Sequence, residues 1–211
     1  MRRARALAVC LLLPAVALGQ ESAFVPSRGM YLGVTSFRPD ADRQLARQEG
    51  HTGLLVGHTW RRSRHLAIDL SVLDTGQQAN MPRVERFPSA SSSGRVDAHI
   101  NVTGIALGAK LIYPIGRFEP YAGAGVGYYA SEISSWGTIV HLFLPSDFAK
   151  RSDSDVGTHV AIGLDYAISP TARLSLEYRR IALDANFGPE FGGKTKVGGG
   201  MTILAIRSVF R

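Results

Sequence analysis

One stretch of the sequence matches a nucleotide-binding pattern. Residues 188–195, Gly-Pro-Glu-Phe-Gly-Gly-Lys-Thr, fit the phosphate-binding loop GxxxxGK[ST]. That chemistry requires a buried strand before the loop and a helix after it, because the helix N-terminus holds the phosphates. The segment that follows, from Lys196 to Ile203, contains three consecutive glycines and predicts no helix. We therefore predict an extracellular turn here and no cofactor.

The histidines are the next residues that could carry chemistry, as metal ligands or general bases. They are His51, His58, His65, His99, His141 and His159. None has a second histidine or a carboxylate at the spacing of a helical zinc motif, and the chain has no GxSxG nucleophile elbow. The sequence predicts no catalytic residue, no metal site and no enzyme. A catalytic triad whose residues come from separate strands would show no such motif, and motif spacing does not test for it.

The N-terminus has the pattern of a secretory signal peptide. A basic start is followed by an apolar run from Ala6 to Leu18 and by small residues before Gln20. We expect residues 1–19 to be the signal, with cleavage after Gly19 or alternatively after Ala17. The apolar run is shorter than the ~20 residues of a membrane-spanning helix. Cys10, the only cysteine, lies in this segment, so we expect no disulfide after export.

Residues 20–211 carry eight candidate strands with alternating apolar side chains. Their approximate ranges are 29–37, 52–60, 65–73, 99–113, 118–130, 154–168, 172–184 and 196–210. Polar loops, among them 38–50, 74–97 and 134–152, alternate with short turns at 61–64, 114–117 and 169–171. Such strands, with tight turns at one end and long loops at the other, are typical of outer-membrane barrels.

The predicted fold class is therefore all-β, an eight-stranded antiparallel up-and-down transmembrane β-barrel. Alternate side chains are expected to face lipid, and their neighbours to pack a polar, charge-paired interior. The alternative is a soluble secreted β-sandwich or lipocalin-like barrel, whose apolar faces would turn inward.

One hairpin carries a family resemblance. An apolar strand ends at the turn Pro114–Arg117, and FEPYAGAGVGYYA follows, with Gly123, Gly125 and Gly127 at alternate positions. This hairpin resembles the middle hairpin of the small bacterial outer-membrane barrels typified by OmpA, OmpX and OmpW. The resemblance implies the outer membrane of a Gram-negative cell, with membrane lipid and the barrel assembly machinery as partners.

Charged side chains on the inward faces form the candidate functional site. They are Asp69, Lys110, His159, Asp165, Glu177, Arg179 and Arg207. Unpaired charges would be costly in a lumen only wide enough for side chains, so we expect them to pair across it. Resemblance to the OmpA-like group implies that such a network can act as a gate. A purely structural plug is the alternative that the lumen size favours.

Aromatic residues gather beside the short turns and the C-terminus. The expected periplasmic girdle comprises Trp60, Tyr113, Phe118, Tyr121, Tyr166 and Phe210. Phe210 also resembles the terminal aromatic that such barrels present to their assembly machinery, although Arg211 follows it here.

The expected function is a non-enzymatic outer-membrane role: structural, surface-interacting or a minor permeability path. The alternative is an OmpW-like conduit for small hydrophobic molecules, and a barrel-embedded lipid-modifying enzyme is third. Segment 139–148 is unusually apolar and could either extend the barrel wall or contact a host surface or hydrophobic ligand. Basic residues are spread through the chain, which argues against nucleic acid. We expect a monomer.

Overall fold

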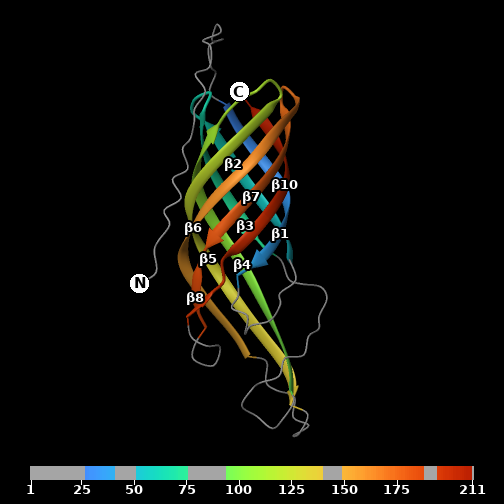
Figure 1. Cartoon of the computed structure of the whole chain (residues 1–211), viewed down its shortest axis with the longest axis vertical. Coiled ribbons are helices and arrows are strands. Elements are labelled where there is room, and N and C mark those ends of the chain that lie inside the picture. Colours follow the sequence, from blue (N-terminus) through green and yellow to red (C-terminus); the bar gives the residue numbers. More distant parts are fainter. Residues whose placement is uncertain (1–26, 41–50, 76–93, 140–148, 188–193, 211) are drawn as a thin grey trace, which may run out of the picture.

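The computed structural model describes residues 27–40, 51–75, 94–139, 149–187 and 194–210. Eight strands close into an antiparallel barrel (Figure 1). They are β1 (Ser27–Pro39), β2 (His51–Arg61), β3 (Leu66–Asp74), β4 (Gly94–Ile112), β5 (Phe118–Ile139), β6 (Ala149–Ser169), β7 (Ala172–Ala182) and β10 (Gly199–Phe210). Two further short strands, β8 (Asp184–Asn186) and β9 (Lys194–Lys196), pair with each other. The predicted up-and-down barrel is confirmed.

In the described ranges, no helix has the length and apolar character needed to span a membrane.

The apolar side chains of the strands face outward and the charged ones face inward, as the alternation predicts. Ile162 is 63% exposed and Leu174 40% exposed on the outer surface, whereas Asp69 and Lys110 are buried inside. A soluble sandwich or lipocalin-like barrel would bury the two apolar residues and expose the two charged ones. The outward apolar faces therefore exclude the soluble alternative, because only lipid would remove that surface from water.

The short turns and both barrel termini lie at one end, which we call the turn end. β1 begins and β10 ends there, since Arg28 pairs with Phe210, and the C-terminal end is at the top of Figure 1. The turn after β4 contains Gly116, whose φ of 59° lies in the left-handed region that favours glycine. Short turns face the periplasm in barrels of this kind, so the opposite, loop end faces outward.

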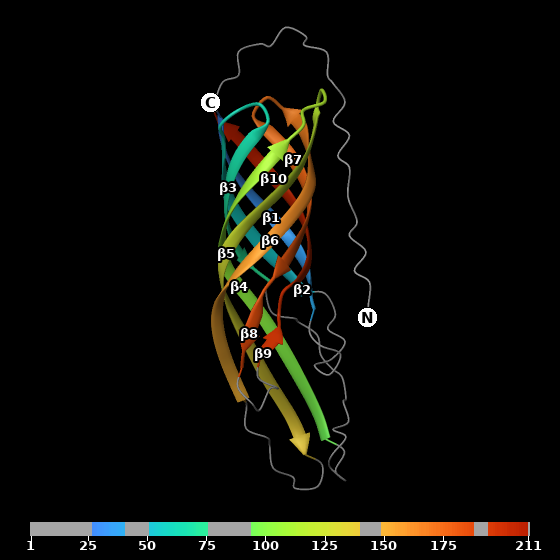
Figure 2. The ribbon, with the colours of Figure 1, turned by 60° about the vertical axis from the view of Figure 1, so that its left-hand side comes forward.

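β4, β5 and β6 extend well beyond the other strands at the loop end (Figure 2). β5 has 22 residues and β3 only 9, whereas about 9 to 11 suffice to cross the membrane. We call the part formed by residues 94–101, 131–139 and 149–157 the extension; its strands pair from Gly94↔Ile139 inward.

Two predicted loops are therefore partly wrong. Residues 94–97 of the expected loop 74–97 belong to β4, and most of the expected loop 134–152 belongs to β5 and β6. Residues 94–97 do keep the alternation, because Val96 and Ala98 alternate with Arg95 and Asp97, so the start of β4 could have been predicted. Residues 134–139 and 149–152 have no such alternation, since strands above the membrane need no apolar face toward lipid. The short pair β8–β9 was likewise not predicted.

Within the described residues, the buried charged side chains of the interior lie at its centre and toward its turn end. The loop-end half is filled by a buried apolar layer of Phe37, Leu55, Leu73, Ile100, Val102, Ile133, Ile181, Met201 and Ile203. The prediction of a wholly polar interior is wrong, because a lumen above the charges can also be closed by close-packed apolar side chains.

Candidate functional site

The centre of the lumen holds two cations between two carboxylates. Lys110 from β4 places its Nζ 2.9 Å from Glu177 Oε2 on β7 and 3.3 Å from Asp69 Oδ1 on β3. Arg179 donates from Nε to Glu177 Oε1 at 2.8 Å, and its Nη2 lies 4.0 Å from Asp69 Oδ2. These four buried charges balance one another, which is what a low-dielectric interior requires.

Hydroxyl groups complete this central cluster. Tyr31 and Thr59 donate to the two Asp69 oxygens at 2.7 and 2.8 Å. Tyr121 donates to Glu177 Oε2 at 2.8 Å, and Arg179 Nη1 donates to Ser71 Oγ at 3.1 Å. Side chains from β1, β2, β3, β4, β5 and β7 thus meet in one network, so the cluster ties the barrel wall together across its lumen.

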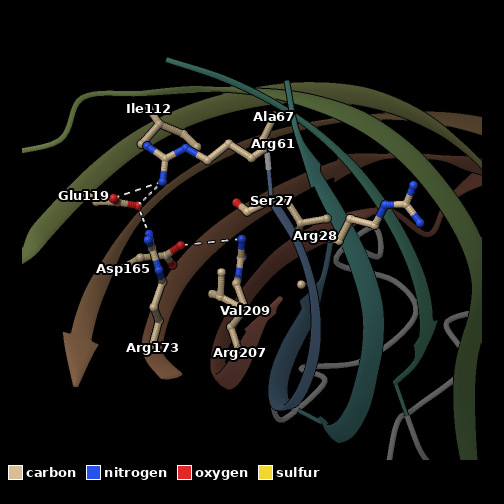
Figure 3. Close-up of a pocket in the computed structure, with 12 residues that line it drawn as sticks. Ser27, Arg28, Arg61, Ala67, Ile112, Glu119, Asp165, Arg173, Arg207 and Val209 are labelled. Atoms are coloured by element: carbon tan, nitrogen blue, oxygen red, sulfur yellow. Dashed lines mark hydrogen bonds and ion pairs between the residues drawn. The ribbon is translucent and has the colours of Figure 1, made fainter. Parts of the chain in front are cut away.

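A second set of charges lies closer to the turn end (Figure 3). Glu119 on β5 accepts from Arg61 Nη1 at 3.0 and 2.9 Å and also pairs with Arg173. Asp165 on β6 accepts from Ser175 Oγ at 2.5 Å, and its other oxygen is 3.5 Å from Arg207 Nη1. This part of the lumen therefore contains more cations than carboxylates.

The structure brings six of the seven expected lumen residues into these two clusters. His159 is also buried, but its Nδ1 has no hydrogen-bond partner within the described chain. Its ring lies beside two glycines instead: a Cβ added to Gly125 would be 2.6 Å from His159 Cε1. His159 is thus accommodated by the missing side chains of Gly125 on β5 and Gly108 on β4, and not by the ion pairs.

Three charged residues of the site were not predicted. Glu119 has the same strand parity as Gly123, and that parity could have identified it as inward-facing. Arg173 shares a face with Ser175 and Glu177 in the same way. Arg61 was assigned to a basic turn, but it is the last residue of β2 and its side chain enters the lumen.

Tyr121 was assigned to the aromatic girdle, and this is wrong. It is 6% exposed and points into the barrel, where it binds Glu177, because it lies two residues before the inward Gly123. A Cβ at Gly163 would be 2.4 Å from its ring, so that glycine makes room for it. The other five expected girdle residues face outward at the turn end: Trp60, Tyr113, Phe118, Tyr166 and Phe210.

We expect Tyr121→Phe to lower the free energy of unfolding by about 1–3 kcal/mol, because Glu177 loses a buried hydrogen-bond donor. Urea unfolding in lipid vesicles measures this. Tyr113→Phe is the matched control, since Tyr113 is 43% exposed on the outer face. Equal effects of the two substitutions would contradict the assignment of Tyr121 to the lumen network.

No group of three or more histidine, cysteine or acidic side chains able to hold a metal ion occurs in the part of the chain that the structure describes. β9 starts at Lys194, inside the segment that matches the phosphate-binding loop, so a strand stands where that motif needs a helix. Residues 188–193 of the segment, most of the apolar segment 139–148 and the expected signal peptide lie outside the described residues.

The chain is similar in fold to several solved outer-membrane barrels. Ail, the attachment invasion locus protein of Yersinia pestis, has 13% identity and a TM-score of 0.57, over 89% of this chain and 100% of that one. OprG of Pseudomonas aeruginosa has 16% identity and a TM-score of 0.57, over 88% and 96%. Neisserial surface protein A has 13% identity and a TM-score of 0.55, over 88% and 97%.

Ail has also been solved in complex with the heparin analogue sucrose octasulfate, and that structure matches at 12% identity with a TM-score of 0.51 over 89% of this chain and 100% of that one. Comparison with curated protein sequences gave no match. The family model described as outer membrane protein beta-barrel domain matches residues 6–200. This chain therefore belongs to the outer membrane protein beta-barrel domain family, and its place is the cell outer membrane.

Proposed function

We propose that this protein is a non-enzymatic barrel that holds the β4–β5–β6 extension at the cell surface, where it binds other surfaces. The observation that carries this proposal is the length of β5 and β6, 22 and 21 residues, about twice what a membrane crossing needs. An ordered sheet that stands outside the membrane is unnecessary for anchoring, so a binding role explains it better than a structural one.

The extension has an open sheet edge along β4. β3 pairs with β4 only as far as Asp74↔Thr103, so among the described residues the backbone of 94–101 pairs with β5 alone. Val102 directs its N–H and C=O toward Thr75, on the β3 side. The backbone N–H and C=O groups of successive residues in a strand point to opposite sides. Residues 96, 98 and 100 therefore point these groups to the same side as Val102, toward the open edge. Such an edge can accept an added strand from a partner.

The lumen supports a plug rather than a conducting path. The buried apolar layer fills the loop-end half, and a charge-balanced cluster fills the centre. A conduit for small hydrophobic molecules would need space in the same apolar layer, whose Phe37, Ile133 and Met201 are 0% exposed. We therefore favour surface interaction over both the gate and the hydrophobic-conduit alternatives.

We expect Ala98→Pro to reduce adhesion by about tenfold, since it removes one donor from the open edge and leaves the β4–β5 ladder intact. Bacteria that display each variant are counted on host-cell layers and on heparin-coated surfaces, the latter because Ail was solved with a heparin analogue. His99→Pro is the comparison variant: its N–H points to β5, so it should also loosen the extension to proteases.

Unchanged adhesion of Ala98→Pro, at equal surface display, would rule out the open β4 edge as the binding element. Loss of adhesion in His99→Pro alone would assign binding to another part of the extension.

A further inference from the structure

A small pocket at the turn end has an excess of positive charge. Of the four arginines that line it, Arg61, Arg173 and Arg207 face its two carboxylates, Glu119 and Asp165 (Figure 3). Arg28 also lines the pocket, but its guanidinium points away from the group (Figure 3). Among the described residues, cations therefore exceed anions by one at this pocket. A partly desolvated excess charge is unfavourable unless an anion compensates it.

Two of the arginines are direct neighbours on adjacent strands. Arg173 of β7 is the register partner of Arg207 of β10, and both side chains enter the lumen. Like charges directly opposite each other in a sheet repel. Glu119 does not relieve this repulsion fully, because it shares its carboxylate between Arg61 and Arg173.

Arg207 is a buried arginine with an unsatisfied donor. Arg207 is 6% exposed, and the Cζ of its guanidinium lies over the Tyr31 ring, 5.1 Å from the ring centroid. Its contact with a carboxylate is the 3.5 Å ion pair to Asp165, and its Nε has no hydrogen-bond partner in the described part of the chain. A guanidinium has five N–H donors, and the buried Nε–H of this one lacks an acceptor.

We propose that Arg173 and Arg207 form a binding site for a phosphate group that enters from the periplasmic side. A phosphate supplies the missing negative charge and has enough oxygens to accept from both guanidinium groups at once, whereas a carboxylate has only two oxygens. The group can come from free phosphate or from the headgroup of an inner-leaflet lipid, because the pocket lies at the periplasmic mouth. This site is separate from the extension and does not depend on the proposed adhesion.

The test is a titration of the folded barrel, labelled with 15N-arginine, in a phosphate-free maltoside detergent. Inorganic phosphate and short-chain phosphatidylglycerol are added in separate arms at constant ionic strength, with acetate as the carboxylate comparison. We expect the Arg207 Nε–H resonance to shift saturably with phosphate or with phosphatidylglycerol. The arm that saturates identifies free phosphate or a lipid headgroup as the source.

Three variants locate the site. Arg173→Gln and Arg207→Gln should each weaken the apparent affinity at least tenfold, because each removes one of the two guanidinium groups. Arg62→Gln is the matched control: it removes the same charge from an exposed residue of the same turn end and should leave the affinity unchanged. Heat-modifiable gel mobility verifies that each variant is folded. If a variant does not fold, the titration of the wild-type protein still tests the proposal.

A shift that grows linearly with concentration in all arms, or one that Arg62→Gln weakens as much as Arg173→Gln, would overturn the proposal. Either result would mean that the arginines respond to general ionic conditions and that water satisfies their donors.

Discussion

Lys110→Ala is expected to lower the free energy of unfolding by about 3–5 kcal/mol, since removing one partner of a buried charge cluster leaves the others uncompensated. Lys110 is 5% exposed and lies between Asp69 and Glu177, so both carboxylates lose their shared cation. The measurement is urea-driven unfolding in lipid vesicles, followed by tryptophan fluorescence and gel mobility.

The matched control for this prediction is Lys194→Ala. Lys194 pairs with Asp184 at the same 3.3 Å distance, but its side chain is 71% exposed, so its loss should cost about 0–1 kcal/mol. Comparable losses for the two lysines would contradict the view that burial makes the central cluster important. The same protein in planar bilayers tests the gate hypothesis: we expect near-zero current from Lys110→Ala, because the apolar layer still closes the lumen.

Phe37→Ala has a comparably large expected effect on the other half of the lumen. Phe37 is fully buried in the apolar layer, beside the loop end of β1. Truncating such a side chain removes its packing and leaves a cavity, which costs about 3–5 kcal/mol. Val34→Ala is the control on the same strand, because Val34 faces outward and loses only about 1–2 kcal/mol of transfer free energy.

Conductance measurements distinguish a plug made of two layers, the apolar layer and the Lys110 cluster, from a gate made of the charged cluster alone. Phe37→Ala alone should stay closed, since the Lys110 cluster remains beneath it. The double variant Phe37→Ala, Lys110→Ala weakens both layers and should give measurable current. Current from Lys110→Ala alone would contradict the two-layer plug and favour the gate.

The alternation of apolar and polar residues was enough to predict the barrel and the faces of its strands within the membrane. Lipid outside and protein inside impose opposite demands on neighbouring residues, so Ile162 and Asp165, for example, reveal their faces by parity alone. The same rule places Glu119 and Tyr121 inside. Tyr121 was missed because an aromatic residue beside a turn suggested the interface instead.

Local pattern could not determine the extension. Strands above the membrane need no apolar face toward lipid, so residues 131–139 and 149–157 carry no apolar alternation, and only pairing with neighbouring strands defines them. Strand pairing of this kind is a property of two segments together.

Only the tertiary structure decided which charges meet. Lys110 and Glu177 are 67 residues apart, and Arg179 and Ser71 are 108 apart. Parity brings all of them to the lumen, but their height along the barrel axis depends on the tilt and stagger of every strand between them. That is also why the opposed arginines at the turn end and the apolar layer at the loop end became visible only in the closed barrel.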